Sequence, residues 1–109
     1  MLAKKERLTR ALFDRSFSIG KRYHCPALQL ITSNSDRFHG SVVVGKKVYK
    51  KAVDRNLLRR RLYAILYEWN KQQNAGNTFI VIAKPAIAKL SKKEYKKELL
   101  QQLLKTTEI

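Results

Sequence analysis

The sequence predicts an α+β fold, a two-layer sandwich in which a small mixed sheet packs against helices. Two observations support this prediction. Helical and strand patterns follow one another in the order α, β, β, α, β, α, with room for one extra short strand before the second helix. The chain has 109 residues, of which 44% are hydrophobic, and this suits a single domain over residues 1–109 with one modest core.

The first elements are expected to be a helix and a strand. From Lys4 to about Phe17, apolar residues recur at helical spacing, and Gly20 ends the pattern. Pro26 then separates a basic dipeptide from a strand over residues 27–31.

A second strand is expected over residues 41–44, after polar turn residues at 32–36. Its run of valines is typical of a strand that is central in a sheet or buried on both faces. The segment 45–51 is too basic and too short for a core element. We therefore expect a cationic loop there, with at most a very short strand.

The longest predicted helix begins just after Asp54, a residue type that often caps helix N-termini. An apolar stripe at helical spacing predicts its buried face: Leu58, Leu62, Ile65, Leu66 and Trp69. An adjoining face is basic at its start and aromatic toward its end: Asn56, Arg59, Arg60, Tyr63 and Tyr67.

The last part of the chain predicts one strand and one helix. Residues 78–83 form the strongest strand pattern, and we expect this strand in the interior of the sheet. Ser91 and Glu94 have the spacing of a capping box, which starts an amphipathic helix with Tyr95, Leu99 and Leu103 on its apolar side.

The charge of the chain points to a polyanionic partner. Lys and Arg total 24 against 8 Asp and Glu, a formal net charge of +16. Nucleic acid and an anionic membrane are the two obvious candidates, but no apolar run approaches the roughly 20 residues that span a bilayer. We expect no membrane association and a cytoplasmic protein. The lone Cys25 cannot form an internal disulfide and is expected to be a packing residue.

Basic residues concentrate where the longest helix begins. Between residues 45 and 61 there are eight, against the single acid Asp54: Lys46, Lys47, Lys50, Lys51, Arg55, Arg59, Arg60 and Arg61. Arginines in a first helical turn oppose the positive end of the helix dipole, whereas a bound phosphate reverses that effect. The cluster therefore favours a phosphate backbone over a merely solvated helix face.

Phe13 and Phe17 form an i, i+4 aromatic pair beside several basic residues. Proteins that bind single-stranded RNA stack bases on aromatic rings while cations meet the phosphates. Core packing of the two rings onto the sheet is an equally good interpretation of the spacing alone.

The sequence contains no recognisable catalytic or metal-binding motif. His24 and His39 are isolated, and no carboxylates have the spacing of an acid and base pair on an apolar wall. We therefore expect no catalytic residues in the protein, and no protein-bound metal ion can be assigned. If the protein takes part in a reaction, its partner is expected to supply the chemistry.

Several motifs occur in a characteristic order along nearly the whole chain. They are Phe13, Phe17 and Gly20; Gly45-Lys46-Lys47-Val48; Lys51-Ala52-Val53; Arg55-Asn56 with Arg59-Arg60; Ile82-Ala83-Lys84-Pro85; and Leu90-Ser91. In this order the sequence resembles the protein subunit of bacterial ribonuclease P.

The resemblance implies an accessory subunit of an endoribonuclease that removes the 5′ leader of precursor tRNA. The RNA subunit would supply the catalytic centre and bind most of the Mg²⁺, and no further protein partner would be required. Expected contacts to the catalytic RNA are Lys46, Lys47, Lys50, Lys51, Arg55, Asn56, Arg59 and Arg60. Expected contacts to the leader, in a cleft between the first helix and the sheet, are Phe13, Phe17, Arg10 and Tyr23.

The family fold also implies a left-handed crossover into the last strand, whereas the general rule for parallel strands predicts a right-handed one. Two positions differ from the family pattern. Tyr63 stands where a further arginine is usual, and Gly45 stands where a serine often precedes the two lysines.

Two other functions compete with this one. A structural protein that binds folded ribosomal RNA would have the same composition, and the aromatic pair distinguishes the two because only leader binding requires it. Double-stranded DNA binding through the longest helix is the third hypothesis, and the broad apolar stripe of that helix argues against it.

Overall fold

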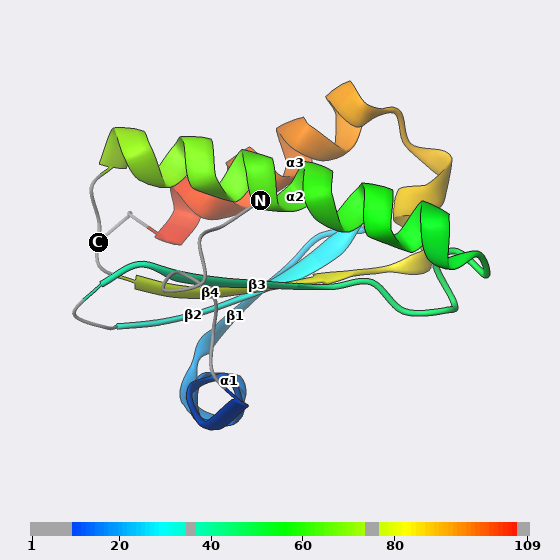
Figure 1. The fold of residues 1–109 in the computed structure, drawn as a ribbon. Helices are drawn as coiled ribbons and strands as arrows, with labels where there is room; N and C mark the ends of the chain where they lie inside the picture. Colours follow the sequence, from blue (N-terminus) through cyan, green and yellow to red (C-terminus); the bar gives the residue numbers. More distant parts are fainter. Residues whose placement is uncertain (1–9, 35–36, 74–76, 107–109) are drawn as a thin grey trace.

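The computed structural model describes residues 10–34, 37–73 and 77–106, and a mixed sheet lies at the centre of this part of the chain (Figure 1). Its strands are β1 (Lys21–His24), β2 (Leu28–Asn34), β3 (His39–Val43) and β4 (Asn77–Ala83), in the spatial order β1-β2-β4-β3. Strands β1, β2 and β4 pair antiparallel, and β3 pairs parallel to β4. The predicted interior position of the strand at 78–83 is confirmed.

Helices cover both faces of this sheet. The long helix α2 (Ala52–Gln73) and the C-terminal helix α3 (Lys92–Thr106) lie on one face, and the short helix α1 (Arg10–Ile19) lies on the other (Figure 1). A short 3-10 helix, η2 (Pro85–Lys89), joins β4 to α3. The predicted α+β sandwich is confirmed, with its main core between the sheet and the layer formed by α2 and α3.

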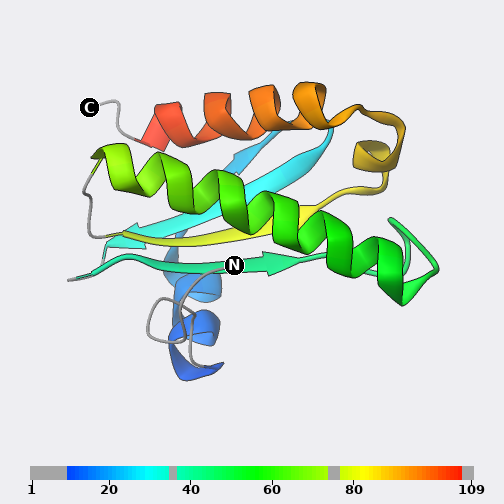
Figure 2. The ribbon, with the colours of Figure 1, turned by 45° about the horizontal axis from the view of Figure 1, so that its top comes forward.

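The connection from β3 through α2 to β4 is left-handed. Figure 2 shows the face of the sheet that α2 and α3 cover, tilted toward the viewer. Strands β3 and β4 both run to the right, and β4 lies above β3. A right-handed connection would place β4 on the other side of β3. The handedness implied by the family resemblance is therefore the one observed.

Three details of the predicted elements were wrong. The extra short strand is β1, at Lys21–His24, and residues 45–51 form turns without a strand. The strand at 39–43 lies at an edge of the sheet, and its residues alternate between buried and accessible because only one face packs on the core. Asp54 lies inside the first turn of α2, which begins at Ala52.

Helix α1 begins at Arg10 in the described part of the chain, so the predicted start at Lys4 lies outside the described residues. Gly20 follows the helix, as predicted, and its amide donates a hydrogen bond to the Ser16 carbonyl at 2.9 Å. A Cβ at Gly20 would lie only 2.6 Å from the Ile31 side chain. Glycine therefore allows α1 to turn directly into β1 against the face of β2.

The apolar stripe of α2 is buried as predicted: Leu58, Leu62, Ile65, Leu66 and Trp69 are all at most 7% exposed. Trp69 meets Phe79 of β4 edge to face, with ring centroids 5.4 Å apart. On α3, Tyr95, Leu99 and Leu103 close the same core.

The capping box at the start of α3 is confirmed. The Ser91 amide donates to Oε1 of Glu94 at 2.9 Å, and the Glu94 amide donates to Oγ of Ser91 at 3.2 Å. Within the described residues, no helix has the length and apolar character needed to cross a membrane.

Candidate nucleic-acid interface

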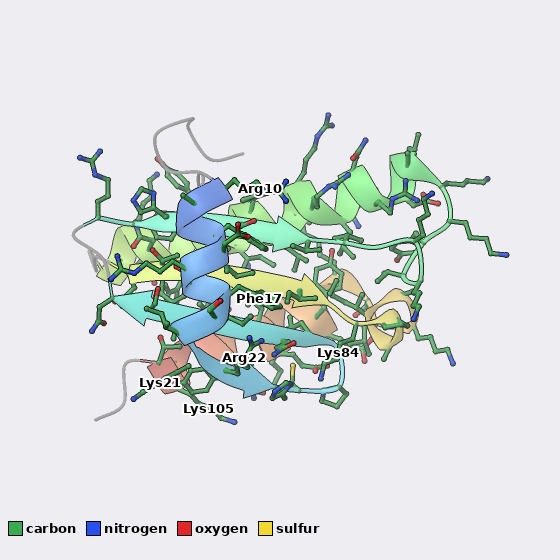
Figure 3. All side chains as sticks on the ribbon, turned by 90° about the horizontal axis from the view of Figure 1, so that it is seen from below. Arg10, Phe17, Lys21, Arg22, Lys84 and Lys105 are labelled. Carbon is green, nitrogen blue, oxygen red and sulfur yellow. The ribbon has the colours of Figure 1, made fainter. Side chains whose placement is uncertain are left out.

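Helix α1 packs across the second face of the sheet and covers only part of it (Figure 3). The strand register aligns Arg22, Ile31, Ile80 and Ser41 in one row across the four strands. Ile31 and Ile80 in this row are fully buried, and the Ser33 hydroxyl, two residues along β2 on the same face, donates to the Ser16 hydroxyl of α1 at 3.0 Å. These contacts hold α1 on the sheet.

The next row on the same face is more accessible. It contains His24, Gln29, Ile82 and Val43, and each of these side chains is exposed or half-buried. Val43 is 38% exposed although it belongs to a strand. We call this row the open row. It forms a mixed polar and apolar strip beside α1.

In Figure 3, Phe17 of the predicted aromatic pair lies on the side of α1 toward the C-terminal ends of β3 and β4, where the open row crosses the sheet. The Phe13 and Phe17 rings stack with centroids 6.0 Å apart and an interplanar angle of 18°. Phe17 is 40% exposed and Phe13 is half-buried, so neither ring belongs to the main core. The core-packing interpretation of the pair is therefore wrong for Phe17, whose ring is partly exposed at the surface.

Arg22 of β1 completes the aromatic site, and the sequence prediction did not include it. Its guanidinium carbon lies 4.6 Å from the centroid of the Phe17 ring, and its Nη2 donates a hydrogen bond to the Phe17 carbonyl. Figure 3 shows both side chains on the same side of α1, with Lys84 farther along the sheet. The alternation of strand residues could have identified Arg22, but only with β1 recognised as a strand.

Arg10 and Tyr23 were also predicted to contact the leader, and the structure brings one of the two to the aromatic pair. Arg10 shares a side of α1 with Phe13 and Phe17, since the three are spaced i, i+3 and i+7. Tyr23 does not join them. It is paired with Leu30 and packs against the main core, because neighbours in a strand point to opposite faces.

A second basic region lies where β3 leads into α2. Val48 is buried and its amide donates to the Gly45 carbonyl at 3.1 Å, which folds the segment into a compact turn. The four lysines predicted to bind RNA surround this anchor and are exposed: Lys46, Lys47, Lys50 and Lys51. Only Val44 and Gly45 separate Lys46 from Val43 of the open row, so the two regions adjoin.

Arg55 has a positioning role in this region. Its Nη1 donates to the Tyr49 and Lys50 carbonyls at 3.1 and 2.7 Å, which fastens the lysine loop to the first turn of α2. Arg59 donates to Oδ1 of Asn56 one turn later. Arg60 is exposed on another side of the helix. The predicted basic residues therefore gather at the N-terminal end of α2, where Arg55 organises the lysine loop.

Tyr63 lies on the side of α2 that faces the sheet edge. The Val42 amide of β3 donates a hydrogen bond to the Tyr63 hydroxyl at 3.2 Å. The tyrosine therefore pairs with a backbone group of an edge strand, a role that the sequence did not reveal.

Residues 10–34, 37–73 and 77–106 contain no group of three or more His, Cys, Asp or Glu side chains arranged to hold a metal ion. Cys25 is half-buried, and burial raises the pKa of its thiol, which suits a packing residue.

The chain is similar in sequence and in fold to proteins of one family. The family model described as Ribonuclease P matches residues 2–108. The ribonuclease P protein component of Microcystis aeruginosa is 34% identical over 101 residues, covering 85% of this chain and 82% of the relative. That of Enterococcus faecalis is 32% identical over 96 residues, covering 88% and 80%.

Solved structures agree with the sequence relatives. The ribonuclease P protein of Thermotoga maritima superposes with a TM-score of 0.78 at 27% identity, over 95% of this chain and 99% of that chain. A mutant of the Staphylococcus aureus ribonuclease P protein has the same fold, with a TM-score of 0.84 at 24% identity over 94% and 89% of the two chains. With a match that spans almost all of its residues, the chain belongs to the ribonuclease P protein component family.

Proposed function

We propose that this protein is the accessory subunit of a cytoplasmic ribonuclease P, binding both the catalytic RNA and the 5′ leader of precursor tRNA. The observation that carries the proposal is the pairing of Phe17 with Arg22 beside the open row. An accessible ring and a cation next to a strip of sheet suit one strand of RNA, since bases stack on the ring and phosphates meet the charge.

The basic end of α2 and its loop bind the catalytic RNA in this proposal. Four exposed lysines around the buried Val48 form a cationic surface that Arg55 holds in shape. The first turn of α2 adds the positive end of a 22-residue helix dipole. Because the loop adjoins the open row, one protein can contact the RNA subunit and the leader at the same time.

The contribution of the protein is electrostatic and positional. The RNA binds most of the Mg²⁺ and supplies the catalytic centre for hydrolysis of the phosphodiester bond. Protein cations near RNA phosphates replace part of the counterion atmosphere and lower the Mg²⁺ needed to assemble the complex. Contacts to the leader favour precursor over mature tRNA, which has no leader.

The test is cleavage of a precursor tRNA at low Mg²⁺ by transcribed ribonuclease P RNA, with and without the protein, and by the protein alone. We expect the protein to stimulate cleavage by the RNA and to be inactive alone. No effect on a competent RNA would contradict the proposal and favour a structural ribosomal-type RNA-binding protein. Cleavage by the protein alone would place the catalytic centre in the protein.

A further inference from the structure

A small cavity lies where the basic loop, the first turns of α2 and the start of α3 meet. It has a volume of about 200 Å³. Leucine side chains form its apolar walls, and its polar lining comes from five residues of three segments: Tyr49, Asp54, Arg61, Lys92 and Tyr95. Neither the aromatic site on α1 nor the loop lysines contribute to it.

Tyr95 is the unusual member of this lining. The residue is 4% exposed, and its hydroxyl has no hydrogen-bond partner among the residues that the structure describes. An unpaired buried hydroxyl costs stability, whereas phenylalanine would fill the same space without that cost. Because the Tyr95 side chain lines the cavity, the missing partner is explained if a polar group bound there completes the hydrogen bonding of the hydroxyl.

A larger groove between α2 and α3 adjoins the cavity. Arg61 and Lys92 line both spaces, and the groove, of about 510 Å³, adds Arg60 and Lys96. All four cations are exposed, and the carboxylate of Glu68 is the acidic group of the groove. The groove therefore presents two arginines from one helix and two lysines from the other.

We propose that a single-stranded segment of the catalytic RNA lies in the groove between α2 and α3, with one unstacked nucleotide in the cavity at Tyr95. The inference rests on the proposed function for the identity of the partner. The exposed cations meet the phosphates, the leucine walls contact the face of the base, and the Tyr95 hydroxyl and the Asp54 carboxylate pair with its edge.

The position of Tyr49 favours RNA over an acidic protein partner. Its carbonyl is held by Arg55 within the lysine loop, and its side chain lines the cavity. The cavity thus adjoins the basic surface proposed for the catalytic RNA, and the two helices that line the groove, α2 and α3, lie on the face of the sheet opposite α1 (Figure 1). A strand of the RNA subunit can pass from the loop into the groove while the leader occupies the other face.

The first test compares two pairs of lysines on α3. The variant Lys92→Ala/Lys96→Ala removes the groove lysines, and the control Lys93→Ala/Lys97→Ala removes the same charge from positions one residue along the same helix. We expect the groove variant to bind the ribonuclease P RNA of the same organism about tenfold more weakly, and its salt slope to fall by about two. The affinity of the control should fall by less than about twofold, because its removed charges act on the RNA only at long range.

The second test is Tyr95→Phe, with binding and thermal unfolding measured on the same protein. The ring still fills the core, so we expect an unchanged or higher Tm together with about threefold to tenfold weaker binding of the catalytic RNA. A lower Tm with unchanged binding would overturn the nucleotide site, because the hydroxyl would then have only a structural role.

The outcomes separate this inference from the proposed function. If wild-type protein fails to bind the catalytic RNA, the proposed function fails. If it binds, and the two lysine pairs weaken binding equally, the groove is not a site and only net charge matters. A larger loss of RNA affinity for the groove pair than for the control pair, together with the Tyr95→Phe result described above, establishes the groove.

Discussion

The guanidinium of Arg22 lies 4.6 Å from the centroid of the Phe17 ring, and it also donates a hydrogen bond to the Phe17 carbonyl. Arg22 is thereby bound to the end of α1 while its charge stays at the surface. The contact joins the helix to the edge strand β1, and it places a ring and a cation together at the border of the open row.

Replacing Phe17 with alanine is expected to weaken leader binding with little change in stability. Stacking of one base on an aromatic ring contributes about 1 to 3 kcal/mol, and the Phe17 ring is 40% exposed. The measurement is the affinity of the holoenzyme for precursor tRNA with and without its leader. Ile19→Ala, at an even more exposed position of the same helix, is the control. Equal losses for the two substrates would contradict a role in leader binding.

Arg22→Lys is expected to retain the charge and still weaken leader binding severalfold. A lysine cannot place a planar group over the ring and donate to the Phe17 carbonyl at once, and an exposed cation–π contact is worth about 0.5 to 1 kcal/mol. The same leader-dependent affinity measurement applies. Lys21→Ala serves as the control, because Lys21 is also exposed but its strand position points to the other face. A larger loss for Lys21→Ala would indicate a general charge effect.

Local patterns predicted a large part of this fold. The stripe from Leu58 to Trp69, the capping box at Ser91 and the strand at 78–83 depend on neighbouring residues, so periodicity and residue type were sufficient. The basic end of α2 was predicted for the same reason, since charge and helix start are adjacent in the sequence.

Apart from the start of α2, the errors concern relationships between distant segments. Tyr23 faces the core because β1 is paired in register with β2, and β3 lies at an edge because β4 follows it in sequence yet lies between it and β2. Neither fact is encoded by local spacing. The left-handed crossover also contradicts the general rule, so it was expected only through the family resemblance.

Gly20→Ala is expected to destabilise the protein by about 1 to 3 kcal/mol, as overpacking does. The new Cβ would lie 2.6 Å from the Ile31 side chain, 2.6 Å from the Ser16 carbonyl oxygen and 2.9 Å from that of Thr32, and the two backbone oxygens cannot move aside cheaply. Urea denaturation measures the change. Gly45→Ala is the matched control, because a Cβ there meets nothing within 4 Å. Similar losses at both glycines would show that close approach is not the cause.

The capping box makes stability depend on pH in the acid range. The hydrogen bonds from the backbone and side chain of Ser91 lower the pKa of Glu94 from its ordinary value of 4.5. Its stabilisation is therefore present above that unfolded-state value and is lost as the pH falls through the lower folded-state pKa. Thermal unfolding of wild type and Glu94→Gln from pH 6 to pH 3 is expected to show a difference in Tm that shrinks toward acid. A constant difference would contradict the assignment.

Tyr63→Phe is expected to loosen the edge of the sheet where β3 meets α2. The substitution keeps the ring and removes the acceptor of the Val42 amide, at a cost of about 1 kcal/mol for the lost hydrogen bond. Because the Val42 amide loses its hydrogen-bond acceptor, the loss should appear as faster amide hydrogen exchange in β3, a few residues before the lysine loop. Tyr67→Phe, one turn along α2, is the control, since its ring instead meets Lys71. Unchanged exchange at Val42 in the Tyr63 variant would show that the hydroxyl does not hold the strand, and that the tyrosine at this position is retained for another reason.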